Sequence, residues 1–219
     1  MLRAAVFDLD HTLFDPTTLP RALFDGLEAH VRRVAANHLP EAVVDAAIAD
    51  AWRLPFDRVV AKHQLPPTVS AAWHEAARSL EVTTPLLPYD DVVRGLRHLP
   101  LRRFLLTTGF RRLQESKLRE LGLASLFLAV YIDALDPPGP AGKRALLRQL
   151  LQEQELSPSE VVVFGDRADD ELSAAQSLGI VAVQVVRPGV VASSEVPWRI
   201  STFDGLLTLL PQLSGAGAA

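Results

Sequence analysis

The chain has 219 residues, of which 48% are hydrophobic and 22% are charged, values typical of a globular protein with one sizeable core. A net charge of −4 without a basic block argues against nucleic acid as the main partner, and the absence of cysteine excludes disulfides, thiolate metal sites and a cysteine nucleophile. Because no apolar run approaches the roughly 18 residues of a membrane span and no signal peptide is recognisable, we expect a cytoplasmic protein with no membrane partner.

The first predicted element is a strand that ends in acidic residues. The apolar run Ala4–Phe7 is typical of a strand buried on both faces of a parallel sheet. Asp8 and Asp10 follow it, and if the strand ends near Asp8, both carboxylates project into the crevice where open α/β sheets bind ligands. Such close like charges require a cation, for which Mg²⁺ is suited, or a shared proton. Taken alone, a capped strand–loop junction explains this Asp-x-Asp pattern equally well.

A helical segment follows the first strand. It is rich in alanine, lacks convincing strands and is interrupted by prolines. Helical patterns cover Arg21–His38, Glu41–Trp52, Pro55–Gln64 and Thr68–Leu80. We predict that residues 16–86 form an all-helical domain inserted into a core made of residues 1–15 and 87–219.

The rest of the chain alternates between strands and helices, which indicates a parallel sheet with helices on both faces. The predicted strands are Arg103–Gly109, Leu126–Ile132, Val161–Phe164, Val181–Val186 and Trp198–Ile200. The predicted helices are Asp90–His98, Leu113–Leu121, Lys143–Gln154, Asp170–Leu178 and Phe203–Leu210. The expected fold class is therefore α/β, a doubly wound, Rossmann-like parallel sheet with an inserted all-helical domain.

Polar residues gather at the ends of three of the predicted strands. Besides Asp8 and Asp10, they are Thr107 and Thr108, with Gly109, at the end of the second strand, and Asp166, Asp170 and Glu171 after the strand Val161–Phe164. Because the carboxyl ends of parallel strands lie at one edge of a sheet, we expect these residues to converge. Lys143 stands at a predicted helix N-terminus, where the macrodipole disfavours a cation, and this indicates a nearby anion.

These motifs together resemble those of the haloacid dehalogenase (HAD) superfamily of aspartate-nucleophile phosphohydrolases. Asp8–Thr12 matches the first motif, DxDxT, and Leu105–Gly109 matches the second, a hydrophobic strand that ends in Thr or Ser. Lys143 is the candidate for the third motif, and Gly165–Glu171 for the acidic fourth. The resemblance spans residues 1 to about 190, and the helical insertion lies where type-I (C1) caps occur. Within the superfamily, the sequence is similar to the nucleotidase-like and phosphoglycolate phosphatase-like branches.

Two motifs depart from the family pattern. The usual Lys-Pro of the third motif is absent, since residues 136–143 read Asp-Pro-Pro-Gly-Pro-Ala-Gly-Lys. Lys117 is the alternative to Lys143, but its helix pattern favours a solvated surface lysine. The fourth motif offers several acids, and the residues that follow Glu171 favour Glu171 over Asp170 as the second acid.

The resemblance implies a role for four side chains. Asp8 attacks phosphorus and forms an aspartyl-phosphate. Asp10 protonates the leaving oxygen and then takes a proton from the hydrolytic water. Thr107 donates to a phosphoryl oxygen, and Lys143 neutralises charge on Asp8 and on the phosphoryl group.

The resemblance also implies a Mg²⁺ site. Its ligands are the Asp8 carboxylate, the backbone carbonyl of Asp10 and the Asp166 carboxylate, while Glu171 or Asp170 orders the metal-bound waters. Backbone amides complete an anion-binding site. These amides lie around Leu9, Thr108 and Gly109.

The leading functional hypothesis is a Mg²⁺-dependent phosphatase that acts on a small phosphorylated metabolite, with the helical cap closing to exclude water. A phosphomutase on the same scaffold is one alternative, and a catalytically silent scaffold, suggested by the altered lysine motif, is another. A receiver-type signalling domain also carries acids, a hydroxyl and a lysine on its strand ends, but it is much shorter and lacks a helical insertion after its first strand. The sequence predicts neither the substrate nor the oligomeric state.

Overall fold

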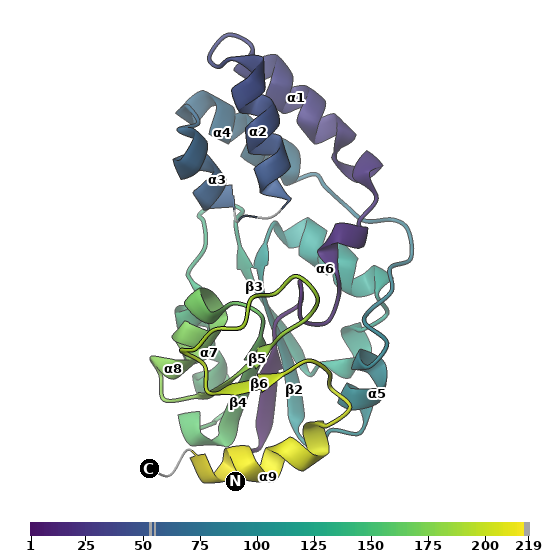
Figure 1. Cartoon of the computed structure of the whole chain (residues 1–219), viewed down its shortest axis with the longest axis vertical. Coiled ribbons are helices and arrows are strands. Elements are labelled where there is room, and N and C mark those ends of the chain that lie inside the picture. The colour runs from purple at the N-terminus through teal and green to yellow at the C-terminus, as the bar shows by residue number, and fades with distance from the viewer. Residues whose placement is uncertain (53, 55, 217–219) are drawn as a thin grey trace.

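The computed structural model describes residues 1–52, 54 and 56–216, and this part of the chain contains one six-stranded sheet (Figure 1). All neighbouring strands are parallel, in the order β3-β2-β1-β4-β5-β6. The strands are β1 (Ala4–Phe7), β2 (Arg102–Gly109), β3 (Ala129–Ala134), β4 (Val161–Gly165), β5 (Val181–Val185) and β6 (Trp198–Ile200). The chain winds from β1 outward to β3 and then crosses to β4, so the winding direction reverses between β1 and β4.

The central strand β1 is buried on both faces because its four residues are all apolar. Ala5 and Phe7 belong to the hydrophobic core on one face of the sheet, and Ala4 and Val6 to the core on the other. Phe7 stacks on Phe164 of β4, with the ring centroids 5.0 Å apart. Because Phe7 immediately precedes the first acidic residue, this packing fixes where that acid leaves the sheet.

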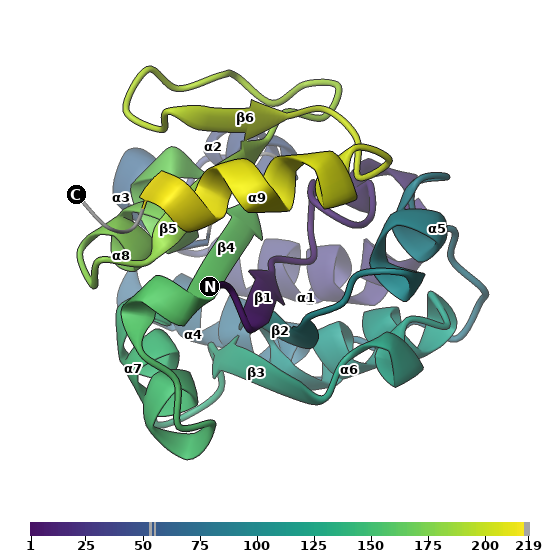
Figure 2. The same ribbon diagram turned by 90° about the horizontal axis from the view of Figure 1, so that it is seen from below.

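Helices cover both faces of the sheet (Figure 2). One face carries α5 (Val92–Arg97), α6 (Arg111–Glu120) and α9 (Leu206–Ala216), whose apolar residues join the core around Phe7. The other face carries α7 (Lys143–Glu153) and α8 (Ser173–Gln176). The predicted doubly wound α/β fold is confirmed.

Among the described residues, the four helices that follow β1 and precede α5 lie at the opposite end of the molecule from α9 (Figure 1). They are α1 (Asp25–Ala35), α2 (Glu41–Ala51), α3 (Phe56–His63) and α4 (Pro67–Ala77). They form a hydrophobic cluster of their own, against which Phe110 and Leu135 pack. Since Phe110 directly follows β2 and Leu135 directly follows β3, the four helices lie over the carboxyl edge of the sheet.

Several predicted boundaries differ from the structure. Strand β3 begins at Ala129 rather than at Leu126, because Ala124–Leu126 forms a 3-10 turn before the chain joins the sheet. Residues Arg21–Phe24 are a separate 3-10 turn before α1, and the helix predicted from Asp170 is instead a π-helical turn, Ala168–Leu172, followed by the short α8. Pro55, the predicted start of the third helix, lies outside the described residues.

Within the described ranges, no helix combines the length and apolar character that crossing a membrane requires.

Candidate active site

The two acidic segments meet where the winding of the sheet reverses. Phe7 of β1 lies level with Phe164 of β4, and the amide of Asp8 donates to the Phe164 carbonyl at 2.9 Å. Gly165 and Asp166 follow Phe164, so Asp8 and Asp166 leave neighbouring strands at the same edge. Open α/β sheets bind their ligands at this position.

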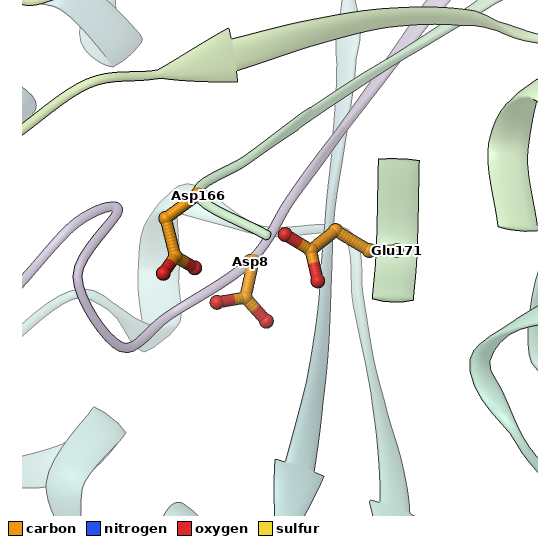
Figure 3. A group of neighbouring side chains, drawn as sticks. All are labelled: Asp8, Asp166 and Glu171. Atoms are coloured by element: carbon orange, nitrogen blue, oxygen red, sulfur yellow. The ribbon is translucent and has the colours of Figure 1, made fainter. Parts of the chain in front are cut away.

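Three carboxyl groups gather there (Figure 3). Oxygen atoms of Asp8, Asp166 and Glu171 all lie within 4.8 Å of one another. The Nζ atom of Lys143 donates to Asp8 Oδ1 and to Glu171 Oε2, each at 2.8 Å, and lies 3.3 Å from Asp170 Oδ2. Although burial acts to lower the pKa of Lys143, the surrounding carboxylates raise it well above its ordinary value, so this lysine stays charged.

The protein alone does not balance the charge of this group. Burial raises the pKa of Asp8, and the charges of Glu171 and Asp10 add to that rise, while Lys143 opposes it. Burial likewise raises the pKa of Asp166, and Asp8 and Glu171 act in the same direction. In the part of the chain that the structure describes, no basic side chain pairs with Asp166. A set of hard oxygen ligands with excess negative charge fits a divalent cation such as Mg²⁺.

The glycine before Asp166 makes room for Glu171. A Cβ atom at Gly165 would lie 2.2 Å from Glu171 Oε1, which is closer than any real contact. The same oxygen accepts a hydrogen bond from the Arg167 amide at 2.7 Å. The sequence left both Glu171 and Asp170 open as the second acid, and the structure places Glu171 in the carboxylate group and Asp170 outside it. Asp170 has a non-helical backbone (φ −126°, ψ −105°), which turns it away from the path of a regular helix.

The end of β2 lies beside this group. Thr107 is buried, and its strand neighbours β1 with Leu105 level with Phe7. At Gly109 a Cβ atom would lie 2.4 Å from Gln114 Nε2, so glycine allows the Gln114 side chain to approach. Gln114 Nε2 donates to the Thr108 carbonyl at 2.7 Å and thereby fastens α6 to the end of β2.

Asp10 has a separate set of partners. Its two carboxylate oxygens accept hydrogen bonds from Lys117 Nζ at 3.0 and 2.8 Å, and Gln114 Nε2 donates to Oδ2 at 3.3 Å. The predicted surface position of Lys117 is therefore wrong, since this lysine is buried. The sequence contained a signal for it: Gln114 and Lys117 share the i, i+3, i+4, i+7 face of α6 with the buried Leu118 and Leu121. A polar residue on such a face requires a buried polar partner.

An ion pair joins helix α3 of the helical segment to the turn after β4. Arg58 of α3 forms an ion pair with Asp169, which lies in the π-helical turn after β4. Arg167 lies 3.2 Å from the other oxygen of Asp169. Both members of the Arg58–Asp169 pair are about half exposed, so water screens it.

Comparison with known proteins gives concordant results. A family model described as haloacid dehalogenase-like hydrolase matches residues 2–179. The glyceraldehyde 3-phosphate phosphatase of Methanopyrus kandleri is 28% identical over 208 residues, which cover 85% of this chain and 85% of the relative.

Solved structures share the fold at low sequence identity. The HAD phosphatase from Thermococcus onnurineus aligns with a TM-score of 0.63 at 20% identity, covering 95% of this chain and 98% of that one. The HAD-hydrolase YfnB from Bacillus subtilis, solved bound to magnesium, aligns with a TM-score of 0.61 at 14% identity, covering 95% and 98% of the two chains. These similarities extend over the sheet and the inserted helices together.

Proposed function

Because this chain belongs to the haloacid dehalogenase-like hydrolases, we propose that it hydrolyses a small phosphomonoester through an aspartyl-phosphate on Asp8. The observation that carries the proposal is the position of Lys143, which bridges Asp8 and Glu171 beside Asp166 at the reversal point of the sheet. The Methanopyrus kandleri relative is named for the hydrolysis of a phosphorylated triose, which supports a small phosphorylated metabolite as substrate.

We assign the attack on phosphorus to Asp8. Lys143 holds its Oδ1 atom, and among the described residues no side chain donates to Oδ2, so this oxygen is the nucleophile. In the first step, a bond forms between Oδ2 and phosphorus while the bond to the ester oxygen breaks, and Asp10 gives its proton to the departing oxygen. In the second step, water attacks the phosphorus of the aspartyl-phosphate and gives a proton to the Asp10 carboxylate, while the bond between phosphorus and Asp8 Oδ2 breaks. The products are the alcohol, inorganic phosphate and a regenerated Asp8 carboxylate.

The phosphoryl oxygens need compensating donors during both steps. We assign this role to the Lys143 ammonium and the Thr107 hydroxyl, which lies at the end of β2 next to β1. Backbone amides at the two strand ends add further donors. They lie around Leu9, Thr108 and Gly109.

The metal site is the set of hard oxygens described above. Mg²⁺ would be held by the carboxylates of Asp8 and Asp166 and the backbone carbonyl of Asp10, with Glu171 orienting its water ligands. When bound, it supplies positive charge against the phosphoryl oxygens. Residues 16–86 serve as the cap, and their position over the carboxyl edge of the sheet allows them to exclude water from Asp8.

The proposal is tested by measuring phosphate release from an aryl phosphate with and without Mg²⁺. We expect Mg²⁺-dependent turnover in the wild type and only background release in Asp8→Asn, which keeps the size of the side chain. Asp204→Asn is the matched control, because Asp204 pairs with Arg94 on the surface. Turnover that survives in Asp8→Asn, or none in the wild type on the aryl phosphate or on a panel of sugar phosphates and nucleotides, would contradict the proposal.

A further inference from the structure

We propose that Lys117 and Gln114 are positioning residues that hold the Asp10 carboxyl group where it exchanges a proton with the leaving oxygen. This inference rests on the proposed function, since it takes Asp10 as the acid–base group. It adds a second lysine, which acts on Asp10 rather than on Asp8, to the residues on which turnover depends.

Hydrogen bonds from two side chains of α6 hold the Asp10 carboxylate. Lys117 donates to both oxygens of Asp10, at 3.0 and 2.8 Å, and Gln114 adds a longer bond of 3.3 Å to Oδ2. Only 5% of the Lys117 side chain is exposed, whereas 27% of the Asp10 side chain is exposed. The cation is therefore buried in the protein, and the acid that it holds remains partly exposed.

A structural role alone does not explain a lysine at this position. Residue 117 lies on the buried face of α6, next to Leu118 in a helix that packs on the apolar core. Within the described chain, Asp10 is the one carboxylate that pairs with Lys117. An apolar side chain on such a face commonly gives equal or greater stability than a buried ion pair, so a buried pair is weak support for a purely stabilising role.

Gln114 connects Asp10 to the strand that borders the phosphoryl site. Its Nε2 atom donates both to Asp10 and to the Thr108 carbonyl, the latter at 2.7 Å. Gly109 lets this amide come within a distance that a Cβ atom would block. A displacement of Asp10 relative to the end of β2 would therefore break the Gln114 bridge.

The two acids of the first motif are thus held from opposite faces of the sheet. Lys143, from α7, binds Asp8 and Glu171, while Lys117, from α6, binds Asp10. Asp10 accordingly lies outside the group of three carboxylates that fits a metal. This separation keeps the acid–base group apart from the nucleophile.

The test uses two esters that differ in their need for a proton. An alkyl phosphate has a poor leaving group and needs proton donation, whereas a nitrophenyl phosphate has a good leaving group and needs little. We expect Lys117→Met to lower kcat/KM by about 10²-fold or more for the alkyl ester, within the range of general acid catalysis, and by less than about tenfold for the aryl ester. Asp10→Asn should give the same pattern, and the double variant should lose no more than Asp10→Asn alone.

Controls separate positioning from folding. Arg119→Met removes an exposed cation from the same helix and should leave both esters unaffected. If Lys117→Met does not fold, Gln114→Ala provides the second test and should show a smaller loss with the same dependence on the leaving group.

An equal loss for both esters, or no loss for either, would overturn the positioning role while leaving the Asp8 chemistry intact. Failure of the proposed function would be recognised separately, by turnover that persists in Asp8→Asn.

Discussion

Strand β1 and the segment that follows it are adjacent in sequence and opposite in physical character. Ala4–Phe7 is fully buried and apolar, with every side chain packed in one of two cores. Asp8 is also buried, but its environment contains two further carboxylates and one ammonium group. Burial stabilises the first segment and opposes ionisation in the second. The sheet thus supplies the stability that allows an unfavourable concentration of charge at its edge.

The largest effect is expected from removing the ammonium group at that edge. Lys143→Met leaves Asp8 and Glu171 without their cation, so we expect turnover to fall by about 10²–10³-fold. Breaking a buried ion pair should also lower the free energy of unfolding by about 3–5 kcal/mol. Urea denaturation with and without Mg²⁺ would measure this loss, and bound Mg²⁺ should recover part of it. Arg148→Met, which removes an exposed cation from α7, is the control. A Lys143→Met protein as active as this control would contradict the role assigned to the buried ammonium group.

The apolar side of the comparison is tested by Phe7→Ala. Phe7 is fully buried and contacts the rings of Phe164 and Phe203. The loss of buried area and the cavity left behind should lower the free energy of unfolding by about 3–5 kcal/mol. Leu128→Ala, at an exposed apolar position, should change it by less than about 0.5 kcal/mol. Equal effects from the two substitutions would show that β1 does not carry the stability assigned to it.

Burial should oppose ionisation outside the site as well. It raises the pKa of both tyrosines in the chain, Tyr89 and Tyr131, to about 12. Because their pKa values are higher in the folded than in the unfolded state, their contribution to stability is present below about pH 10 and is lost as the pH rises toward 12. Tyrosinate absorbance should therefore appear near pH 12 in the native protein and near pH 10 in denaturant. Coincident titrations in the two states would contradict the assignment.

The smallest effect is expected from the exposed ion pair between α3 and the turn after β4. Arg58→Gln removes the partner of Asp169, and exposed pairs contribute about 0–1 kcal/mol. Thermal denaturation should show a shift that is small beside that of Lys143→Met. A comparable shift in the two variants would mean that the Arg58–Asp169 contact, rather than the buried charges, governs the stability of this edge.

Much of the fold could be predicted from periodicity and spacing. The strand Ala4–Phe7 and the helix from Lys143 lie where they were expected, because a fully apolar run and an amphipathic repeat are local signals. The start of β3 was misplaced by three residues, since the apolar run that includes Leu126 continues from a 3-10 turn into the strand. Periodicity does not distinguish these conformations at a boundary.

The site was harder to predict in detail. Strand ends at one edge bring Asp8 and Asp166 together, as the order of elements indicates. The choice between Glu171 and Asp170 depended on a π-helical turn that has no sequence signature of its own. Lys117 was misassigned because a lysine on an amphipathic helix is usually solvated. Its place on the apolar face of α6 indicated burial, but its partner Asp10 lies far away in the sequence and is identified only by the structure.

The central claim, that Asp8 is the nucleophile, is tested most directly by trapping the intermediate. The enzyme would be quenched with acid during turnover of a phosphate ester labelled at phosphorus, and the phosphate bound to the protein would be measured. The account predicts a label on the wild type that hydroxylamine removes, as expected for an acyl phosphate, and no label on Asp8→Asn. A label that persists in Asp8→Asn, or that resists hydroxylamine, would contradict it.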